Sequence, residues 1–199
     1  MIRVVVRSCE AAVMIKRILI AAALATTAWP FAGIPTASAQ VPVGPGPTNY
    51  TVQPQPAPGT CHYRTAANGQ TLPDPTCTPG AISPKVTPDT LDRTICRSGY
   101  TKSIRPPKAI TGAEKQASAA AYGYTGSLSD AEYDHLVPLA LGGDPNDPRN
   151  LWVEPGASPN PKDDVESQLH DLVCAGRVPL AAAQEAIAAN WTTALSAVG

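Results

Sequence analysis

Two adjacent side chains that can do chemistry, Asp134 and His135, lie within the stretch YDHLVPLALGGDPNDPRNLW, residues 133–152. An imidazole with a pKa near its usual value of about 6.5 can take a proton from water at neutral pH. A carboxylate beside it can hold a hard divalent cation, which neutralises charge on a leaving oxygen. Hydrolysis of a phosphodiester needs both functions, so the pair predicts a site for that class of reaction.

Two asparagines follow at positions from which they could complete such a site. Asn150 opens the segment after the loop, where its amide can orient the imidazole of His135. Asn160 precedes Pro161 at the expected start of a helix, and its side-chain oxygen is a candidate ligand for the same cation. Asn-Pro is also common at helix starts, so a capping role for Asn160 is the alternative.

Nearby charged residues give further candidates for the site. Arg149 and Lys162 are candidate phosphate contacts, with a solvated surface charge as the alternative for each. Asp163 is an alternative ligand for the cation. The other two histidines, His62 and His170, stand alone in the sequence and predict no site.

Short strands and a loop must position Asp134 and His135. Residues 131–136 and 150–154 are expected to be strands, joined by a loop over residues 137–149. The glycine pair at 142 and 143 supplies positions in this loop where a positive φ is tolerated.

A helix is expected directly after the second strand. Asn160-Pro161 gives it a favourable start and Gly176 an end. Its apolar residues recur at helical spacing: Val165, Leu169, Leu172 and Val173. Further helices are expected over residues 112–122 and 180–195.

This arrangement resembles the HNH endonucleases of the His-Me finger, or ββα-metal, superfamily. The resemblance rests on Asp134-His135, the Pro138 and Gly142-Gly143 loop, Asn150-Leu151 and Asn160-Pro161-Lys162. Over residues 74–195 the chain is further similar to small exported bacterial proteins of the HNH type. The resemblance implies an α+β fold with a ββα-metal core at about residues 131–176. Flanking helices and a loop-rich, disulfide-tied N-terminal part would surround that core.

The resemblance also implies a role for each candidate residue. His135 would be the general base, and Asn150 would position it. Asp134 and Asn160 would hold one divalent metal, with Mg²⁺ or Mn²⁺ favoured. The chain would then be an exported endonuclease acting on nucleic acid, with DNA favoured over RNA. Asparagine rather than histidine at position 160, and the lack of zinc-binding cysteine pairs, distinguish it from many HNH domains.

The first 39 residues have the order of a secretory signal peptide. A positively charged start at residues 14–17 precedes an apolar stretch, and the small residues 37–39 precede Gln40. Translation from Met14 would fit this order, and a retained N-terminal anchor is the alternative. We expect the mature chain to begin at Gln40, to be secreted or periplasmic, and to keep no stable membrane association.

Four of the five cysteines remain after the signal segment. An even number in an exported chain predicts two disulfides, with three possible connectivities. We favour a local bond between Cys61 and Cys77 and a long-range bond between Cys96 and Cys174. A zinc site is the alternative, although no pair of these cysteines has CxxC spacing.

Composition divides the mature chain into a linker and one domain. Residues 40–60 are rich in Pro and Gly and predict an extended linker, followed by a single domain over residues 61–199. The resemblance described above implies that this domain is HNH-like. Basic residues outnumber acidic ones over 61–115, whereas acidic residues dominate the rest of the domain. The basic segment from Arg93 to Lys115 is therefore a candidate surface for the nucleic-acid backbone.

Two other functions fit the same sequence. A non-catalytic envelope binding module could use a degenerate HNH scaffold, and the acidic second half and Asn160 favour this alternative. A metal-dependent hydrolase of another phosphoester or of a cell-wall component would use the same residues, since a fold does not fix its substrate.

Overall fold

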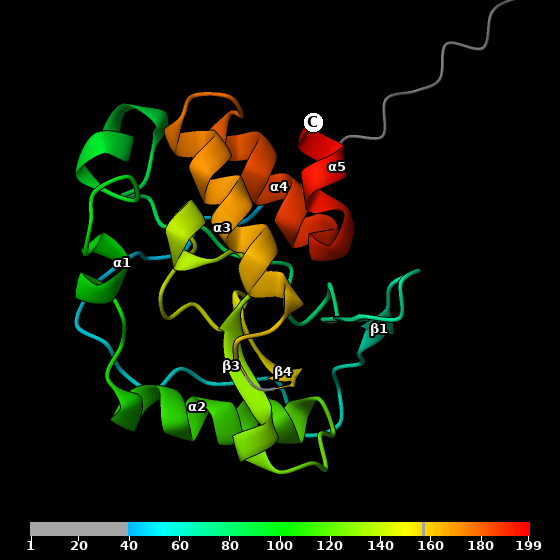
Figure 1. Ribbon diagram of the computed structural model, residues 1–199. Coiled ribbons are helices and arrows are strands. Elements are labelled where there is room, and N and C mark those ends of the chain that lie inside the picture. Colours follow the sequence, from blue (N-terminus) through cyan, green and yellow to red (C-terminus); the bar gives the residue numbers. More distant parts are fainter. Residues whose placement is uncertain (1–39, 157) are drawn as a thin grey trace, which may run out of the picture. The chain divides into compact units, whose positions relative to one another are not determined.

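The computed structural model describes residues 40–156 and 158–199, and Figure 1 shows the arrangement of their helices and strands. The expected signal segment, residues 1–39 with the possible start at Met14, lies outside the described residues. The described part combines helices with two small antiparallel sheets, which confirms the α+β class. Its helices and strands are β1 (Arg64–Thr65), β2 (Thr71–Leu72), α1 (Tyr100–Ser103), α2 (Lys108–Ala121), β3 (Ala131–His135), β4 (Leu151–Pro155), α3 (Pro161–Cys174), α4 (Leu180–Asn190) and α5 (Ala194–Val198). Within these residues no helix combines the length and the apolar character that a membrane span requires.

The antiparallel hairpin β3–β4 carries the Asp-His pair, and Figure 1 shows it between α2 and α3. Ala131 pairs with Pro155 at one end of the hairpin, and His135 pairs with Leu151 at the other. Both strands match the expected ranges to within one residue. Because successive side chains of a strand alternate between its faces, Asp134 and His135 point to opposite faces of the hairpin.

The loop between the two strands is held closed by Asn150. Its Oδ1 accepts hydrogen bonds from the backbone N–H groups of Val137 at 2.9 Å and Ala81 at 3.2 Å. Its Nδ2 donates to the carbonyl oxygens of Val137 and Asp144, both at 3.0 Å. Gly143 is required in this loop because a Cβ there would lie 1.7 Å from the carbonyl oxygen of Val137.

The start of α3 has a complete capping box. Asn160 caps the helix by accepting the backbone N–H of Lys162 at 2.8 Å, and Asp163 accepts the backbone N–H of Asn160 at 2.7 Å. Farther along, Leu169 and Val173 are buried in the main apolar core, as their spacing predicted. The predicted strand, loop, strand, helix order is therefore present.

The other expected helices differ from the structure at their ends. α2 begins four residues before the expected start at residue 112, directly after Pro107. The expected helix over residues 180–195 is divided into α4 and α5 by a 3₁₀ turn. The division occurs because the Asn190 side chain accepts the backbone N–H of Thr192 at 3.0 Å, which caps a new turn.

Two cysteine pairs lie at disulfide distance, and they are the favoured pairs. Cys61 and Cys77 have their Cα atoms 5.9 Å apart, and Cys96 and Cys174 have theirs 5.6 Å apart. The second bond joins Cys174 at the end of α3 to Cys96, which lies in the basic segment just before α1. Both separations lie within the usual range for a disulfide.

Residues 41–53, which we call the strap, lie against the domain although the sequence predicted a linker. Gly44 donates its backbone N–H to the Ile82 carbonyl oxygen at 2.8 Å. The backbone N–H of Gly46 donates to Asp144 Oδ2 at 2.6 Å. Backbone hydrogen bonds and a buried Val41 thus make the strap part of the folded unit, which corrects the expectation of a free spacer.

Candidate active site

His135 ends β3, and only 9% of its surface is exposed. Its Nε2 atom lies 3.0 Å from the carbonyl oxygen of Pro145. A carbonyl oxygen can only accept a hydrogen bond, so Nε2 carries the proton of the neutral ring and Nδ1 carries the free electron pair. Nδ1 has no hydrogen-bond partner within the described part of the chain, and His135 lines a cavity at the protein surface.

The pKa of His135 is lowered to about 4, chiefly because burial disfavours the charged imidazolium. The nearby cations Arg105 and Lys162 lower this pKa further. The hydrogen bond to Pro145 and the charge of Asp134 act in the opposite direction and are outweighed. His135 is therefore neutral at pH 7, which leaves it able to accept a proton, but the lowered pKa makes it a weaker base than an exposed imidazole.

A cavity of about 230 Å³ opens beside His135. It is lined by Arg105, Pro106, Lys108, Thr111, Tyr133, His135 and Leu151. Arg105 and Lys108 are exposed, and neither forms an ion pair with any residue that the structure describes. Lys108 also begins α2, whose first backbone N–H groups give that helix end a partial positive charge. The cavity therefore suits an anion such as a phosphate.

The basic segment that was expected to face nucleic acid is only partly free to do so. Lys115, its last residue, donates to the carbonyl oxygens of Leu128 at 2.6 Å and Ala131 at 2.7 Å. Its ammonium thus ties α2 to the start of β3. Arg105 and Lys108 are the members of the segment that line the cavity.

Asp134 faces the opposite side of the hairpin, where its carboxylate is already engaged. Its Oδ2 accepts the indole N–H of Trp152 at 2.9 Å. The Lys162 ammonium lies 2.9 Å from Oδ2 and 3.1 Å from Oδ1 of the same carboxylate. Both Asp134 and Lys162 are buried, so this ion pair is internal to the protein.

Lys162 therefore does not contact phosphate, which corrects the interpretation made from the sequence. Its side chain is 1% exposed, and its ammonium also donates to the His135 carbonyl oxygen at 2.9 Å and to Glu166. Burial alone would lower the pKa of Lys162, but the carboxylates of Asp134, Glu166 and Glu154 raise it above its usual value. Lys162 is thus a permanently charged internal cation.

More carboxylates surround Lys162 than its single charge can balance. Burial, with a further contribution from the charge of Asp134, raises the pKa of Glu154 to about 9. Burial raises the pKa of Glu166 to about 7, against the opposing charge of Lys162. Glu154 is therefore protonated at neutral pH and Glu166 partly so. These acidic residues were not recognised as a cluster from the sequence, because it forms only when α3 meets the hairpin.

The two asparagines serve the backbone. Asn160 Oδ1 caps α3, and its Nδ2 lies 3.3 Å from Glu132 Oε2. Asn150 forms no hydrogen bond to His135 within the described residues. It instead fixes the Asp144 carbonyl, one residue before the Pro145 carbonyl that accepts from the imidazole. Any effect of Asn150 on His135 is exerted through this loop.

The divalent metal implied by the resemblance does not fit the pair Asp134 and Asn160 in this arrangement. Both Asp134 oxygens lie against the Lys162 ammonium, and Asn160 Oδ1 is used as the helix cap. No group of three or more His, Cys, Asp or Glu side chains within residues 40–156 and 158–199 is arranged to hold a metal ion. The alternative ligand, Asp163, accepts the backbone N–H of Asn160.

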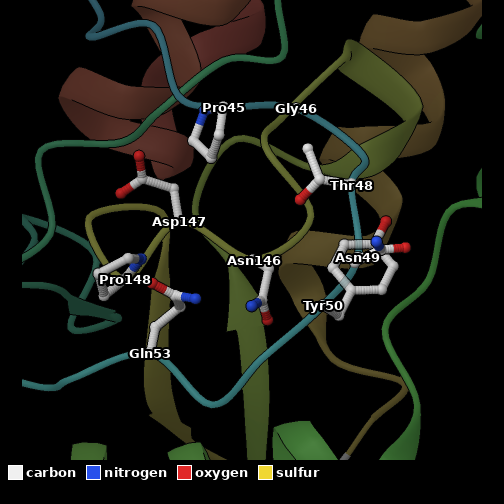
Figure 2. Close-up of a pocket in the computed structure, with 9 residues that line it drawn as sticks. All are labelled: Pro45, Gly46, Thr48, Asn49, Tyr50, Gln53, Asn146, Asp147 and Pro148. Atoms are coloured by element: carbon white, nitrogen blue, oxygen red, sulfur yellow. The ribbon is translucent and has the colours of Figure 1, made fainter.

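The loop that holds His135 is itself braced by the strap, and Figure 2 shows the small cavity between them. Asn146 donates its Nδ2 to the carbonyl oxygen of Thr51 at 2.8 Å. The Asp144 carboxylate accepts two backbone hydrogen bonds, one from the N–H of Gly46 in the strap and one from the N–H of Asn146 in its own loop. These contacts join the strap to the residues on either side of Pro145.

Arg149, the second candidate phosphate contact, lies at the end of this loop. Its guanidinium pairs with Asp147 and also approaches the carbonyl oxygen of Val43 in the strap at 3.3 Å. The Arg149 side chain is 46% exposed, so it remains accessible to a ligand despite the ion pair.

No family model, curated protein or solved structure matches the chain. The arrangement of residues around His135 and Lys162 is therefore the observation on which a function can be argued.

Proposed function

We propose that this domain is an exported HNH-type endonuclease with a ββα core formed by β3, β4 and α3, and that His135 is its general base. One observation carries the proposal. A neutral imidazole with a free Nδ1 lies in the wall of a cavity that also presents Arg105 and Lys108. A base beside two exposed cations is what an attack on an anionic phosphodiester needs.

The state of His135 supports a role as proton acceptor. Because Nε2–H is held by the Pro145 carbonyl, Nδ1 is the atom that would take a proton from a water near the phosphorus. The resulting hydroxide would form the new P–O bond while the P–O bond to the leaving oxygen breaks. The leaving oxygen would take a proton from solvent, and His135 would then release its proton to solvent. A positioned general base contributes about 10²–10⁴ in rate when its pKa lies near the working pH. The lowered pKa of His135 places its contribution toward the lower end of that range.

The start of α2 supports the binding of the substrate. Arg105 and Lys108 would contact the non-bridging phosphate oxygens, and the first N–H groups of α2 would add to the attraction. Contacts of this kind recognise the backbone and not the base, so binding would be sequence-blind and would weaken with salt.

The two cysteine pairs support the proposed location. Disulfides persist in oxidising compartments such as the periplasm or the extracellular medium. The bonds Cys61–Cys77 and Cys96–Cys174 therefore fit a secreted or periplasmic protein, which is also the destination that the signal segment predicts.

The test is cleavage of plasmid DNA and of RNA by oxidised residues 40–199. We expect the wild-type chain to cleave and His135→Gln to lose the activity. His62→Gln is the matched control, since His62 is exposed and lies outside the cavity. Equal cleavage by wild type and His135→Gln, with both folded, would overturn the assignment of the base.

A second function, binding of nucleic acid without cleavage, is favoured by the engagement of Asp134. The carboxylate that precedes the base in sequence is held by Lys162, so it is not free to hold a divalent cation that would neutralise charge on a leaving oxygen. In that case the folded chain would bind an oligonucleotide with affinity that depends on Arg105 and Lys108, yet leave it intact. A gel-shift titration beside the cleavage assay separates the two functions.

A further inference from the structure

The ammonium group of Lys162 lies buried at the junction between the end of β3 and the start of α3. Lys162 Nζ is surrounded by oxygen atoms from three residues: both carboxylate oxygens of Asp134, the His135 carbonyl oxygen and Glu166 Oε1. The side chain is 1% exposed. An ammonium has three donors, and these oxygens are sufficient to receive all of them.

The backbone fixes Lys162 in this place. Its N–H is held by the cap residue Asn160 at 2.8 Å, and Pro161 before it sets the first helical position. Glu166, one turn farther along α3, accepts from the ammonium on the same side of the helix. The side chain is therefore held at both ends, by the helix cap and by the carboxylates.

A divalent ion would have to displace this ammonium to reach Asp134. Mg²⁺ binds carboxylate oxygens at about 2.0–2.1 Å and needs free electron pairs directed toward it. The Asp134 oxygens instead lie at hydrogen-bond distances of 2.9 and 3.1 Å from Nζ, and Oδ2 also accepts from Trp152. Two cations on one carboxylate in a buried site would repel each other strongly.

We infer that the Lys162 ammonium is the resident cation of the hairpin–helix junction, and that Asp134 binds Lys162 in place of a divalent metal. The inference goes beyond the proposed cleavage activity and does not rest on it. It holds equally for an enzyme and for a binding module, so its tests measure metal binding and lysine reactivity and not cleavage.

The first test is titration of wild-type residues 40–199 with Mn²⁺, with the free ion followed by electron paramagnetic resonance. We expect Asp134→Asn to leave the titration unchanged, because Asp134 contributes to no metal site. One Mn²⁺ per wild-type chain, with an affinity about tenfold or more weaker in Asp134→Asn, would overturn the inference.

The second test needs no substitution and so avoids any failure to fold. Lysines of the wild-type chain are acylated briefly, with and without Mn²⁺, and the sites are quantified by mass spectrometry. We expect Lys162 to react far more slowly than the exposed Lys102, with no change on adding Mn²⁺. Faster labelling of Lys162 in the presence of Mn²⁺, with Lys102 unchanged, would show that the metal displaces the ammonium and would overturn the inference.

Discussion

The two faces of the β3–β4 hairpin differ although adjacent residues supply them. On one face His135 is neutral, keeps a free ring nitrogen and borders a cavity with two exposed cations. On the other face Asp134 is buried in an ion pair with Lys162. Beside this pair, Glu154 is protonated at pH 7 and Glu166 is partly protonated. The His135 face is arranged to bind an anionic ligand, whereas the charge on the Asp134 face is balanced by Lys162 of the protein itself.

This difference shows how little a two-residue motif determines by itself. Strand alternation sends neighbouring side chains to opposite environments, so their roles depend on what packs against each face. Here the start of α2 leaves the His135 face open, whereas the first turn of α3 fills the Asp134 face with Lys162. The predictions below test whether the two faces are as different as this comparison states.

The largest effect is expected on the His135 face, in the rate of cleavage. His135→Gln should lower kcat/KM for nucleic-acid cleavage by about 10²–10⁴, because the base is lost while its neighbours remain. Steady-state rates on plasmid and RNA, with folding checked by circular dichroism, measure this. If Asp134→Asn, at an equal folded fraction, reduced the activity more than His135→Gln, the assignment of the reactive face would be reversed.

On the Asp134 face, substitutions are expected to lower the stability of the fold. Lys162→Met should reduce the free energy of unfolding by about 3–5 kcal/mol, since it leaves Asp134 as an uncompensated buried charge. Adding Asp134→Asn to this variant removes that charge and should restore part of the loss. Urea denaturation of both variants measures the difference. A loss of less than about 1 kcal/mol for Lys162→Met, as for an exposed pair, would contradict the buried arrangement.

The pH dependence of stability should have opposite signs for the two faces. Folding lowers the pKa of His135 from 6.5 to about 4, so its contribution is present above pH 6.5 and is lost as the pH falls toward 4. Folding raises the pKa of Glu154 from 4.5 to about 9, so its contribution is present below pH 4.5 and is lost as the pH rises toward 9. Unfolding free energies across this range should show that His135→Gln flattens the acid side and Glu154→Gln the alkaline side. If the unfolding free energy of a variant changes with pH as steeply as that of the wild type, the substituted residue does not cause the pH dependence.

The smallest effect is expected for the cations that line the cavity beside His135, and it concerns the affinity for nucleic acid. Arg105→Gln or Lys108→Gln should weaken binding of duplex DNA several-fold and reduce the salt slope by about 0.9 for each phosphate that is no longer neutralised. Arg177→Gln, at an exposed position outside the cavity, is the matched control. Fluorescence anisotropy at several salt concentrations measures both quantities. Equal weakening by Arg177→Gln would mean that net charge, and not the cavity, attracts the ligand.

The sequence predicted those parts of the fold that have local signals. The strands around His135 and the capped helix after Asn160 depend on alternation, helical spacing and cap chemistry, all of which act over a few residues. An even cysteine count predicted two disulfides with three possible pairings, and proximity in sequence favoured Cys61–Cys77, which the structure has at disulfide distance. These elements were predicted to within a few residues.

The parts that depend on distant packing were not predicted. A lysine in the first turn of an amphipathic helix is usually at the surface, and nothing local indicates that Lys162 turns inward to Asp134. The composition of the strap indicates an extended chain but not the surface on which it lies. Arg105 and Lys108 belonged to a basic segment of the sequence, and only the start of α2 shows that they border the cavity with His135.

The state of the His135 imidazole is the most direct test of the central claim, that this residue is a neutral base facing an anion site. The chain has three histidines, so ¹H–¹⁵N spectra of the imidazoles can be assigned with His135→Gln. At pH 7 we expect a neutral, Nε2-protonated ring whose Nδ1 resonance moves when a cleavage-resistant phosphorothioate oligonucleotide is added. A charged or Nδ1-protonated ring at that pH, or an Nδ1 that does not respond to the oligonucleotide, would contradict the claim.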